Sequence, residues 1–417
     1  MQQFNYPTQL NTIFRRLIKA NIKPIIVGGY VRDFFLNIKS KDIDIELYNI
    51  DSLDRVEEIL QPFGKVNSVG KSFGVVKLLY NDLDLDFSLP RSDSKTKEGH
   101  KGFRVAIQTD FDFTAAAQRR DFTMNAIGYD VIEKKLLDPY HGVDDLNKRL
   151  LRAVDLNKFG EDPLRVLRAI VFTSRFKLHI EPKLYTLLKE MMQKNVLNEL
   201  PKERIFEEIK KLLLKSSQPS LGFKLLKELS GFTFFSEFQT LREEEFQAIL
   251  NALDRVVSIA HASNEKEKIT LMLAILTSKF SKEQQHSFLE KLTNQKEILK
   301  NVEKLTNISF ELTHKSNYAI YKLATQTEIA LFALYLLALY PNEEKKIKKL
   351  IKKAKELDIY HKALSPFVQG KDLITLGLKP SKEFSKILEE VYEKQLREEL
   401  FTKEDCLEYL KRVVILS

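Results

Sequence analysis

Two neighbouring segments carry the strongest pattern in this chain: Ile25-Ile26-Val27-Gly28-Gly29-Tyr30-Val31-Arg32-Asp33 and Lys41-Asp42-Ile43-Asp44-Ile45-Glu46. The first is an apolar run that ends in two glycines. The second alternates carboxylates with isoleucines, and residues two apart in a strand face the same side. Asp42 and Asp44 therefore point together, while Ile43 and Ile45 point into a core. Such a pair indicates a hard-metal site or a pair of acid/base groups, with a solvated edge strand as the alternative.

The glycine pair lies where a strand feeds a helix. Glycine there lets backbone N–H groups approach a phosphate, which a helix N-terminus also favours. The dinucleotide-binding spacing G-x-G-x-x-G is missing, and so is the Gly-Lys-Ser/Thr of a P-loop. Together with the D-x-D strand, the turn suits a triphosphate carried on divalent metal ions. Arg32 is expected to bind phosphate oxygens, with Asp33 orienting it.

Length and composition narrow the class of protein. The chain has 417 residues, 43% of them hydrophobic, and this length predicts several domains. Its net charge of +9 favours a polyanionic partner. The single cysteine, Cys406, excludes an internal disulfide and fits a reducing cytosol. The first residues lack a signal-peptide pattern. The apolar stretch from Ile329 to Tyr340 is too short to span a bilayer and is expected to be a buried helix. We therefore expect a cytoplasmic protein without membrane contact.

The spacing of apolar residues divides the chain near residue 150. Before it, strands are expected from Pro24 and over 43–48, 75–80 and 83–88, the last two as an antiparallel pair, with helices over 7–20, 30–36 and 53–60. Residues 90–110 are polar and predict a long loop. After it, strand candidates disappear and helical spacing continues to the end, for example over 164–176, 202–215 and 343–357. The fold class is an α/β head, a small mixed sheet with helices, followed by an all-α arm.

Further polar residues suggest additional site groups. Asp84 and Asp86 share one face of their strand, and either could supply a third carboxylate to a two-metal site. Asp121 and Asn125 are four apart and would share a helical face, although a capping acid among surface arginines explains them as well. Asp162 precedes Pro163 at a helix start, where capping alone is a complete structural explanation.

Read together, these segments resemble the class II CCA-adding enzymes and bacterial poly(A) polymerases of the nucleotidyltransferase superfamily. The resemblance rests on motifs that stand in order: Gly28 to Asp33 with Asp42-Ile43-Asp44, Arg119 to Ala126, Asp138 to Leu146, Glu161 to Arg165, and Lys202 to Glu208. It continues at Gly370 to Ile374. It implies a catalytic head over 1–150, a helical neck over 151–230, and a body and tail over 231–417 that bind tRNA.

The resemblance also implies a role for each site residue. Asp42 and Asp44 would hold two Mg²⁺ ions, and Asp86, five residues before Arg91, is favoured over Asp84 as the third catalytic carboxylate. The nucleotide-binding residues would be Gly29 and Arg32 at the triphosphate, Arg120, Asp121 and Asn125 around the ribose, and Asp162, Arg165 and Arg168 at the base. The family often has an arginine where this sequence has Val171, and Arg175 could take its place. Residues 90–110 would be a flexible loop at the site.

The expected function is addition of C, C and A to the 3′ end of tRNA from CTP and ATP. A poly(A) polymerase would share the head motifs, and a partial enzyme would add CC or the final A alone. A non-catalytic RNA-binding module is the alternative from another class, against which the intact Asp42, Asp44, Asp162 and Arg165 argue. The lysine-rich segment 345–353 fits an RNA phosphate path and a solvated helix face equally well.

Overall fold

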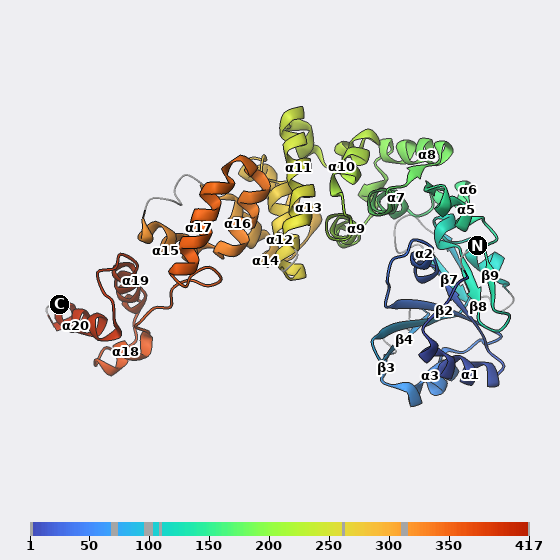
Figure 1. The fold of residues 1–417 in the computed structure, drawn as a ribbon, viewed down its shortest axis with the longest axis horizontal. Coiled ribbons are helices and arrows are strands. Elements are labelled where there is room, and N and C mark those ends of the chain that lie inside the picture. Colours follow the sequence, from blue (N-terminus) through green and yellow to red (C-terminus); the bar gives the residue numbers. More distant parts are fainter. Residues whose placement is uncertain are drawn as a thin grey trace. The chain divides into compact units, whose positions relative to one another are not determined.

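The computed structural model describes residues 3–67, 74–95, 103–107, 111–260, 263–309 and 316–415. The chain separates into two compact units, residues 1–239 and 240–417 (Figure 1). A mixed sheet with surrounding helices makes up much of the first unit, and the second is helical. The predicted fold class is confirmed. The predicted boundaries at 150 and 230 stay predictions.

The first unit contains a seven-stranded sheet with the strand order β3-β4-β5-β2-β1-β8-β9. Its strands are β1 (Lys23–Val27), β2 (Asp42–Tyr48), β3 (Val66–Asn67), β4 (Val75–Tyr80), β5 (Leu83–Ser88), β8 (Gly128–Asp130) and β9 (Lys135–Leu137). Strands β2 and β5 pair in parallel, and the other neighbours pair antiparallel. The predicted β4–β5 hairpin is confirmed.

Helices cover the sheet because each strand has an apolar face to bury. Helix α1 (Asn11–Lys19) packs on β1, α3 (Leu53–Leu60) packs on β4, and the two helices contact one another. Another apolar cluster joins Ile25, Val27 and Tyr48 to α4 (Phe113–Ala117). Helix α2 (Gly29–Phe35) starts at the second glycine of the pair, one residue before the predicted start at residue 30.

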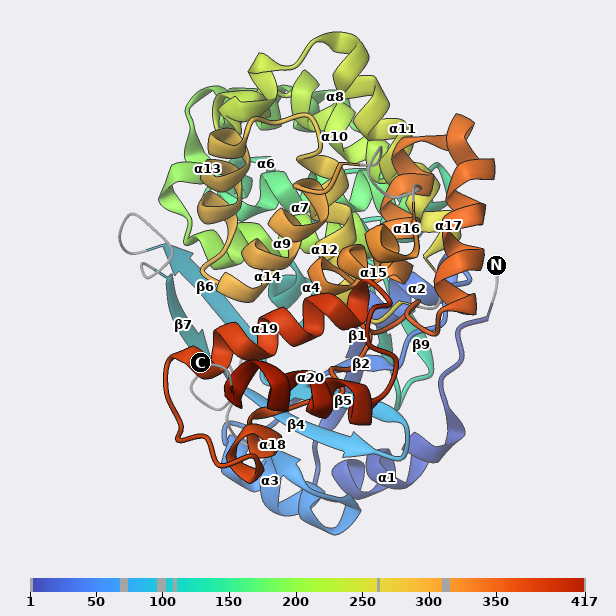
Figure 2. The same cartoon turned by 90° about the vertical axis from the view of Figure 1, so that its left-hand side faces the viewer.

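The predicted loop over 90–110 is partly wrong. Strands β6 (Arg91–Lys95) and β7 (Phe103–Ile107) pair antiparallel as a two-stranded sheet of their own (Figure 2). Residues 96–102 and 108–110 of the predicted loop lie outside the described residues. The ladder is made by backbone groups, so it can form on the polar sequence of β6. The sequence of β7 alternates Phe103, Val105 and Ile107 with Arg104 and Ala106, a strand signal that the loop prediction overlooked. The prediction that strands end near 150 also misses a short parallel pair, β10 (Leu150–Leu151) with β11 (His179–Ile180).

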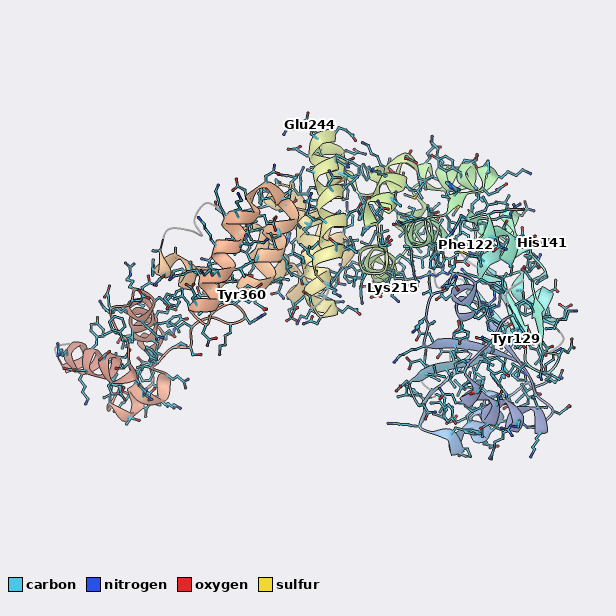
Figure 3. The ribbon with its side chains drawn as sticks, viewed as in Figure 1. Phe122, Tyr129, His141, Lys215, Glu244 and Tyr360 are labelled. Atoms are coloured by element: carbon cyan, nitrogen blue, oxygen red, sulfur yellow. The ribbon has the colours of Figure 1, made fainter. Side chains whose placement is uncertain are left out.

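The first unit also contains helix α7 (Leu164–Phe176) and five further helices in its described part. They are α5 (Gly142–Asn147), α6 (Leu156–Phe159), α8 (Pro182–Gln193), α9 (Lys202–Lys215) and α10 (Pro219–Glu228). Helix α7 packs on α9 and α10. Phe122 follows α4 in the chain (Figure 3). Its ring is fully buried, and its centre lies 5.6 Å from the ring centres of both Phe159 and Phe172. This shared core fixes α7 against the segment that contains Arg119 to Asn125.

The second unit consists of helices in its described part. They are α11 (Glu243–Ile259), α12 (Glu265–Leu276), α13 (Lys282–Leu292), α14 (Lys296–Thr306), α15 (Asn317–Gln326), α16 (Ile329–Leu339), α17 (Glu344–Glu356), α18 (Gly370–Thr375), α19 (Glu383–Leu396) and α20 (Lys403–Ile415). Helix α16 is largely buried against α11, α12 and α17, which confirms the predicted buried helix. Helices α18, α19 and α20 enclose a small core around Leu373 and Cys406. No single helix of the described residues is long and apolar enough to cross a membrane, and the bent pair α15–α16 passes that test by length and composition together.

Candidate active site

Four carboxylates lie side by side on strands β2 and β5. The parallel register places Asp42 beside Asp84 and Asp44 beside Asp86. The intervening Ile43 is 1% exposed, so the predicted alternation of β2 is confirmed. Because neighbours in register share a sheet face, all four carboxylates belong to one face. The structure thus brings the predicted Asp42, Asp44 and Asp86 together.

The electrostatics of Asp44 fit a divalent cation. The surrounding protein desolvates this carboxyl and raises its pKa, opposed by Arg120, while Asp86 adds to the increase. Carboxylate oxygens are the donors that hard divalent cations prefer. In the described part of the chain, no three His, Cys, Asp or Glu side chains already converge on a single ion position. The donor chemistry nevertheless suits the metal, with Asp42 and Asp44 as its expected ligands.

Asp86 has a cationic neighbour. Its Oδ2 atom lies 2.5 Å from the Nζ atom of Lys77, which is its register partner on β4. Asp84 instead faces Leu79 across the same strand pair. Asp86 is therefore the carboxylate next to Asp44, in agreement with the choice that the resemblance favours.

The turn before α2 requires glycine at its first position. Gly28 has φ +69° and ψ −126°, a conformation that side chains rarely adopt. A Cβ atom there would lie 2.8 Å from Nη1 of Arg120 and 3.7 Å from Oδ2 of Asp44. Gly28 therefore lets the chain turn directly beside both groups. Gly29 begins α2 and lines the cleft described below.

Arg32 is buried and held from several sides. Its Nε and Nη2 atoms donate to Oδ1 of Asp33 at 2.8 and 2.6 Å, and Nη1 donates to Oδ1 of Asn125 at 2.7 Å. Its guanidinium lies 5.3 and 4.8 Å from the ring centres of Phe172 and Phe176. Burial lowers the pKa of Arg32, and the Asp33 carboxylate opposes this decrease. The predicted contact with Asp33 is present.

Glu46 is an anchor that the sequence reasoning missed. It is fully buried, and its Oε1 atom lies 2.7 Å from Nη2 of Arg119 and 3.7 Å from Nη2 of Arg120. The Tyr48 hydroxyl donates to its Oε2 atom at 2.9 Å. Burial alone would raise the pKa of Glu46, but Arg120 and Arg119 outweigh it and hold this pKa below its usual value. A glutamate two residues after the D-x-D motif, on the same strand face, was the available signal.

Asp121 is the centre of a buried polar network. It accepts hydrogen bonds from Nδ2 of Asn125 at 2.9 Å and from Nε of Arg168 at 2.6 Å. Burial would raise the pKa of Asp121, yet these partners lower it, Arg168 most strongly. The predicted contact between Asp121 and Asn125 exists, but the predicted helix is wrong. Helix α4 ends at Ala117, and a 3₁₀ turn over Thr123–Asn125 brings the two residues together.

Asp162 and Arg165 do not share a helical face, because α7 begins only at Leu164. Asp162 Oδ1 accepts from the Leu164 backbone N–H at 3.1 Å, as a capping acid does, and Oδ2 lies 3.4 Å from Nη2 of Arg204 on α9. Arg165 has a different partner: its Nη2 atom donates a hydrogen bond to the backbone carbonyl of Arg119 at 2.9 Å. The two residues are thus positioned separately, by α9 and by the turn after α4.

Arg175 does not support Asp162. Its Nη2 atom lies 4.0 Å from Oδ2 of Asp33, and its guanidinium lies 4.7 Å from the centre of the Phe176 ring. Arg204 supplies the ion pair to Asp162 instead, and Val171 is nearly buried. Arg175 nevertheless lines the same cleft as Asp162 and Arg165, and the expectation that it takes the place of the family arginine stays a prediction.

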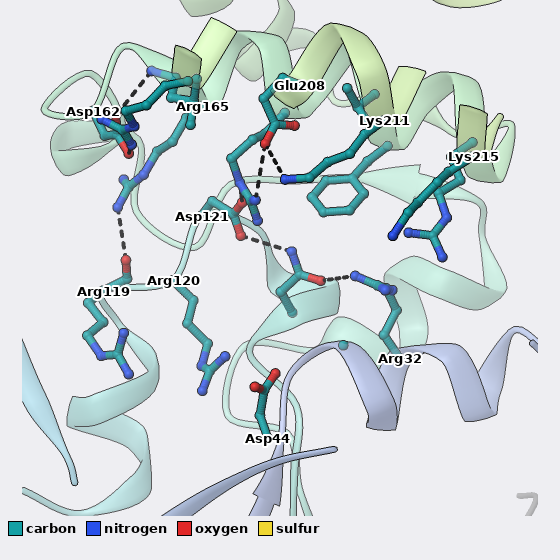
Figure 4. A pocket seen from close by; sticks show the side chains of 18 residues that line it. Arg32, Asp44, Arg119, Arg120, Asp121, Asp162, Arg165, Glu208, Lys211 and Lys215 are labelled. Carbon is teal, nitrogen blue, oxygen red and sulfur yellow. Dashed lines mark hydrogen bonds and ion pairs between the residues drawn. The ribbon is translucent and has the colours of Figure 1, made fainter. Parts of the chain in front are cut away.

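These groups line one cleft of about 530 Å³ (Figure 4). The predicted residues that line it are Gly29, Arg32, Asp44, Arg120, Asp121, Asn125, Asp162, Arg165 and Arg168. Asp42 and Asp86 line an adjoining groove that shares Asp44. Helix α9 adds Arg204, Glu208, Lys211 and Lys215 to the cleft. Their spacing of three or four residues marks one helix face, a signal that would have identified the two lysines.

Three family models match separate segments of the chain. They are "Poly A polymerase head domain" over residues 25–152, "Probable RNA and SrmB- binding site of polymerase A" over 177–240, and tRNA nucleotidyltransferase domain 2 over 260–410. The chain belongs to the family of CCA-adding enzymes and poly(A) polymerases. Nucleotidyltransferases of this family generally use divalent metal ions.

Individual relatives agree with this family. The chain is 34% identical to the CCA-adding enzyme of Actinobacillus succinogenes over 238 residues, which are 56% of this chain and 57% of that protein. It is 28% identical to the CCA-adding enzyme of Lactococcus lactis subsp. cremoris, over 94% and 92% of the two chains. The chain spans about half the length of the first curated relatives that it matches. A solved CCA-adding enzyme in its apo form II shares the fold, with a TM-score of 0.70, 21% identity, and coverage of 98% and 96%.

Proposed function

We propose that this chain adds C, C and A to the 3′ end of tRNA, using CTP and ATP and no nucleic-acid template. One observation carries the proposal: a single cleft is lined both by Asp44, from the carboxylate cluster, and by Asp162 and Arg165. Chemistry at a phosphate and reading of a base can therefore occur on one bound nucleotide. The relatives with the name CCA-adding enzyme support the same activity.

The reaction is attack of the tRNA 3′-hydroxyl oxygen on the α-phosphorus of the nucleotide. A new P–O bond forms, the bond to the β-phosphate oxygen breaks, and pyrophosphate leaves. Mg²⁺ ions, when bound by Asp42 and Asp44, supply charge stabilisation at the attacking and leaving oxygens. Asp86 is the carboxylate that we assign to the hydroxyl proton, since it is the register neighbour of Asp44. Arg32, preoriented by Asp33, holds the triphosphate.

Base selection would come from Asp162 and Arg165. A carboxylate accepts from the exocyclic amino group of cytosine or adenine, while a guanidinium donates to the ring nitrogen beside it. Uracil and guanine present the opposite pattern on that edge. A site built to hydrogen-bond one edge rejects the wrong one by roughly 10⁴–10⁵. The ion pair with Arg204 orients Asp162, which such a site needs.

The ribose would lie near Asp121 and Asn125, between the phosphate and base ends. The buried Asp121 accepts hydrogen bonds from the side chains of Asn125 and Arg168. It would therefore hold both side chains in place when a ribose binds beside them. Arg120 lies closest to the phosphate end, because its Nη1 atom faces Gly28. This order of groups matches the order of parts in a nucleoside triphosphate.

The helical unit would bind the body of the tRNA. On α17 the lysines 345, 346, 348, 349 and 352 are exposed, while Ile347 and Leu350 are buried. An exposed row of lysines can follow an RNA backbone through phosphate contacts. We propose this role for α17, and the cytoplasmic location expected from the sequence stays a prediction.

The test uses tRNA transcripts that end at the discriminator base, at -C and at -CC, with CTP and ATP supplied singly and together. The proposal expects C addition to the first two, A addition to the third, and a stop after CCA. Long A tails on unrelated RNA would show a poly(A) polymerase. A stop after CC, or no C addition, would show a partial enzyme. A protein with Asp42→Ala and Asp44→Ala should lose all nucleotide incorporation. In a non-catalytic RNA-binding module, the same substitutions would leave the function unchanged.

A further inference from the structure

A second groove of about 770 Å³ adjoins the nucleotide cleft, and Asp44 lines both. Its floor is the polar face of strands β3, β4, β5 and β2. One row of register partners crosses these strands as Asn67, Lys77, Asp86 and Asp44. The groove therefore leads from the sheet edge straight to the carboxylates.

The chemistry requires two approaches to the reacting phosphorus. In phosphoryl transfer, the attacking and leaving oxygens lie roughly in line on opposite sides. The arginine-lined cleft suits the triphosphate, so the leaving pyrophosphate belongs there. The attacking hydroxyl must reach Asp44 from another side, and the second groove provides one.

An exposed leucine lies in this groove. Leu79 on β4 is 63% exposed. It lies on the same face of the strand as Lys77, and its register partner on β5 is Asp84. A large apolar side chain in a polar groove offers van der Waals contact to a base, at a place where proteins that bind single strands use aromatic platforms. Lys65, which precedes β3, lines the groove as well and is exposed. The groove thus offers an apolar contact, two lysines and carboxylates, side by side.

We infer that this groove binds the last nucleotides of the acceptor RNA strand. A terminal base packs on Leu79, backbone phosphates contact Lys65 and Lys77, and the 3′-hydroxyl reaches Asp44 and Asp86. The inference rests on the proposed function and adds to it the path of the primer. Lys77 already neutralises Asp86 in the structure, so Lys65 and Leu79 are the better probes.

The first test varies the apolar contact in both directions. In steady-state assays with a minihelix RNA that ends in -C, Leu79→Ala should raise the KM for RNA about fivefold or more, since it removes apolar surface that a bound base would cover. Leu79→Phe should lower this KM, because a ring stacks better on a base. The KM for CTP should stay unchanged in both. Ile132→Ala is the control, because Ile132 is another exposed apolar residue of the same unit (47%) outside the groove.

The second test measures RNA binding without turnover. The affinity of a fluorescent single-stranded oligonucleotide is titrated at several salt concentrations. Each lost phosphate contact should reduce the slope of log K against log salt by about 0.7. Lys65→Gln should show this reduction, while Lys135→Gln, at an exposed position on β9, should not.

The outcomes separate this inference from the proposed function. If the wild-type protein adds nucleotides but the Leu79 and Lys65 variants match their controls in both tests, the groove is not the primer site and the inference is overturned. If the wild type adds no nucleotide to any RNA, the proposed function fails, and the salt titration still reports on the groove. A 4-thiouridine at the primer end should crosslink to β4, and crosslinks confined to other strands would contradict the inference.

Discussion

The substitution Glu46→Gln tests the anchor beneath the candidate active site. In the native protein, one fully buried carboxylate faces two guanidinium groups, with its nearest N···O distance at 2.7 Å to Arg119. Glutamine has nearly the same shape but no charge. The change therefore leaves Arg119 and Arg120 in place with their shared counter-charge removed.

The expected loss of stability follows from burial. Removing one partner of a buried ion pair costs about 3–5 kcal/mol, because the other charge stays buried without compensation. The amide oxygen of glutamine can still accept one hydrogen bond, so we expect the lower end, about 3 kcal/mol. For a unit of this size each kcal/mol lowers the melting temperature by roughly 2–4 °C, which gives a decrease of roughly 6–12 °C.

Circular dichroism during heating measures the melting temperature, and hydrogen exchange at the β2 amides assigns the change to the first unit. The matched control is Glu133→Gln, since the Glu133 side chain is 58% exposed and lies 3.4 Å from Lys23. Exposed pairs are worth about 0–1 kcal/mol, so this control should melt within roughly 4 °C of the wild type. The affinities for CTP and ATP should fall in Glu46→Gln, because Arg120 is no longer held beside Gly28.

The reasoning would be refuted by a Glu46→Gln protein that melts together with its control. Such a result would mean that the two arginines find other partners or water without cost. Lost nucleotide affinity at unchanged stability would point instead to direct contact of Glu46 with the ligand.

Three other outcomes are expected. Gly28→Ala should destabilise the protein by about 1–3 kcal/mol, because its φ of +69° strains any side chain, whereas Gly160→Ala, with no atom within 4 Å of the added Cβ, should change little in thermal melts. Arg204→Ala should weaken CTP and ATP binding by about fivefold in equilibrium titrations, since the partly exposed ion pair to Asp162 is worth about 1 kcal/mol. Asp121 has a lowered pKa, so its stabilisation is present above the unfolded-state pKa and is lost as the pH falls through the folded-state pKa. Asp121→Asn should therefore melt at a lower temperature than the wild type at pH 7, and this difference should shrink as the pH falls. A difference in melting temperature that stays the same from pH 7 down to pH 3 would contradict the assignment of this stability to the ionised Asp121.

Local pattern was enough for the individual elements. The alternation of Asp42 to Ile45 predicts a strand with one acidic face, and the apolar spacing predicts α7 and α9 with the bounds that the structure has. Such periodicity records which side of an element is buried, and these elements carry that record in their own residues. The resemblance likewise depends on motifs that are short and local.

Only the tertiary structure decided which elements meet. The parallel pairing of β2 with β5 makes Asp86 the neighbour of Asp44, and Glu46 reaches Arg119 across 73 positions. The hydrogen bond between Asp121 and Asn125 arises from a 3₁₀ turn, and Asp162 finds its partner on α9. These contacts depend on how the whole unit buries its apolar surface, a sum over distant segments that no local pattern contains. The sequence by itself therefore determined the reacting groups, while the packed structure decided their neighbours.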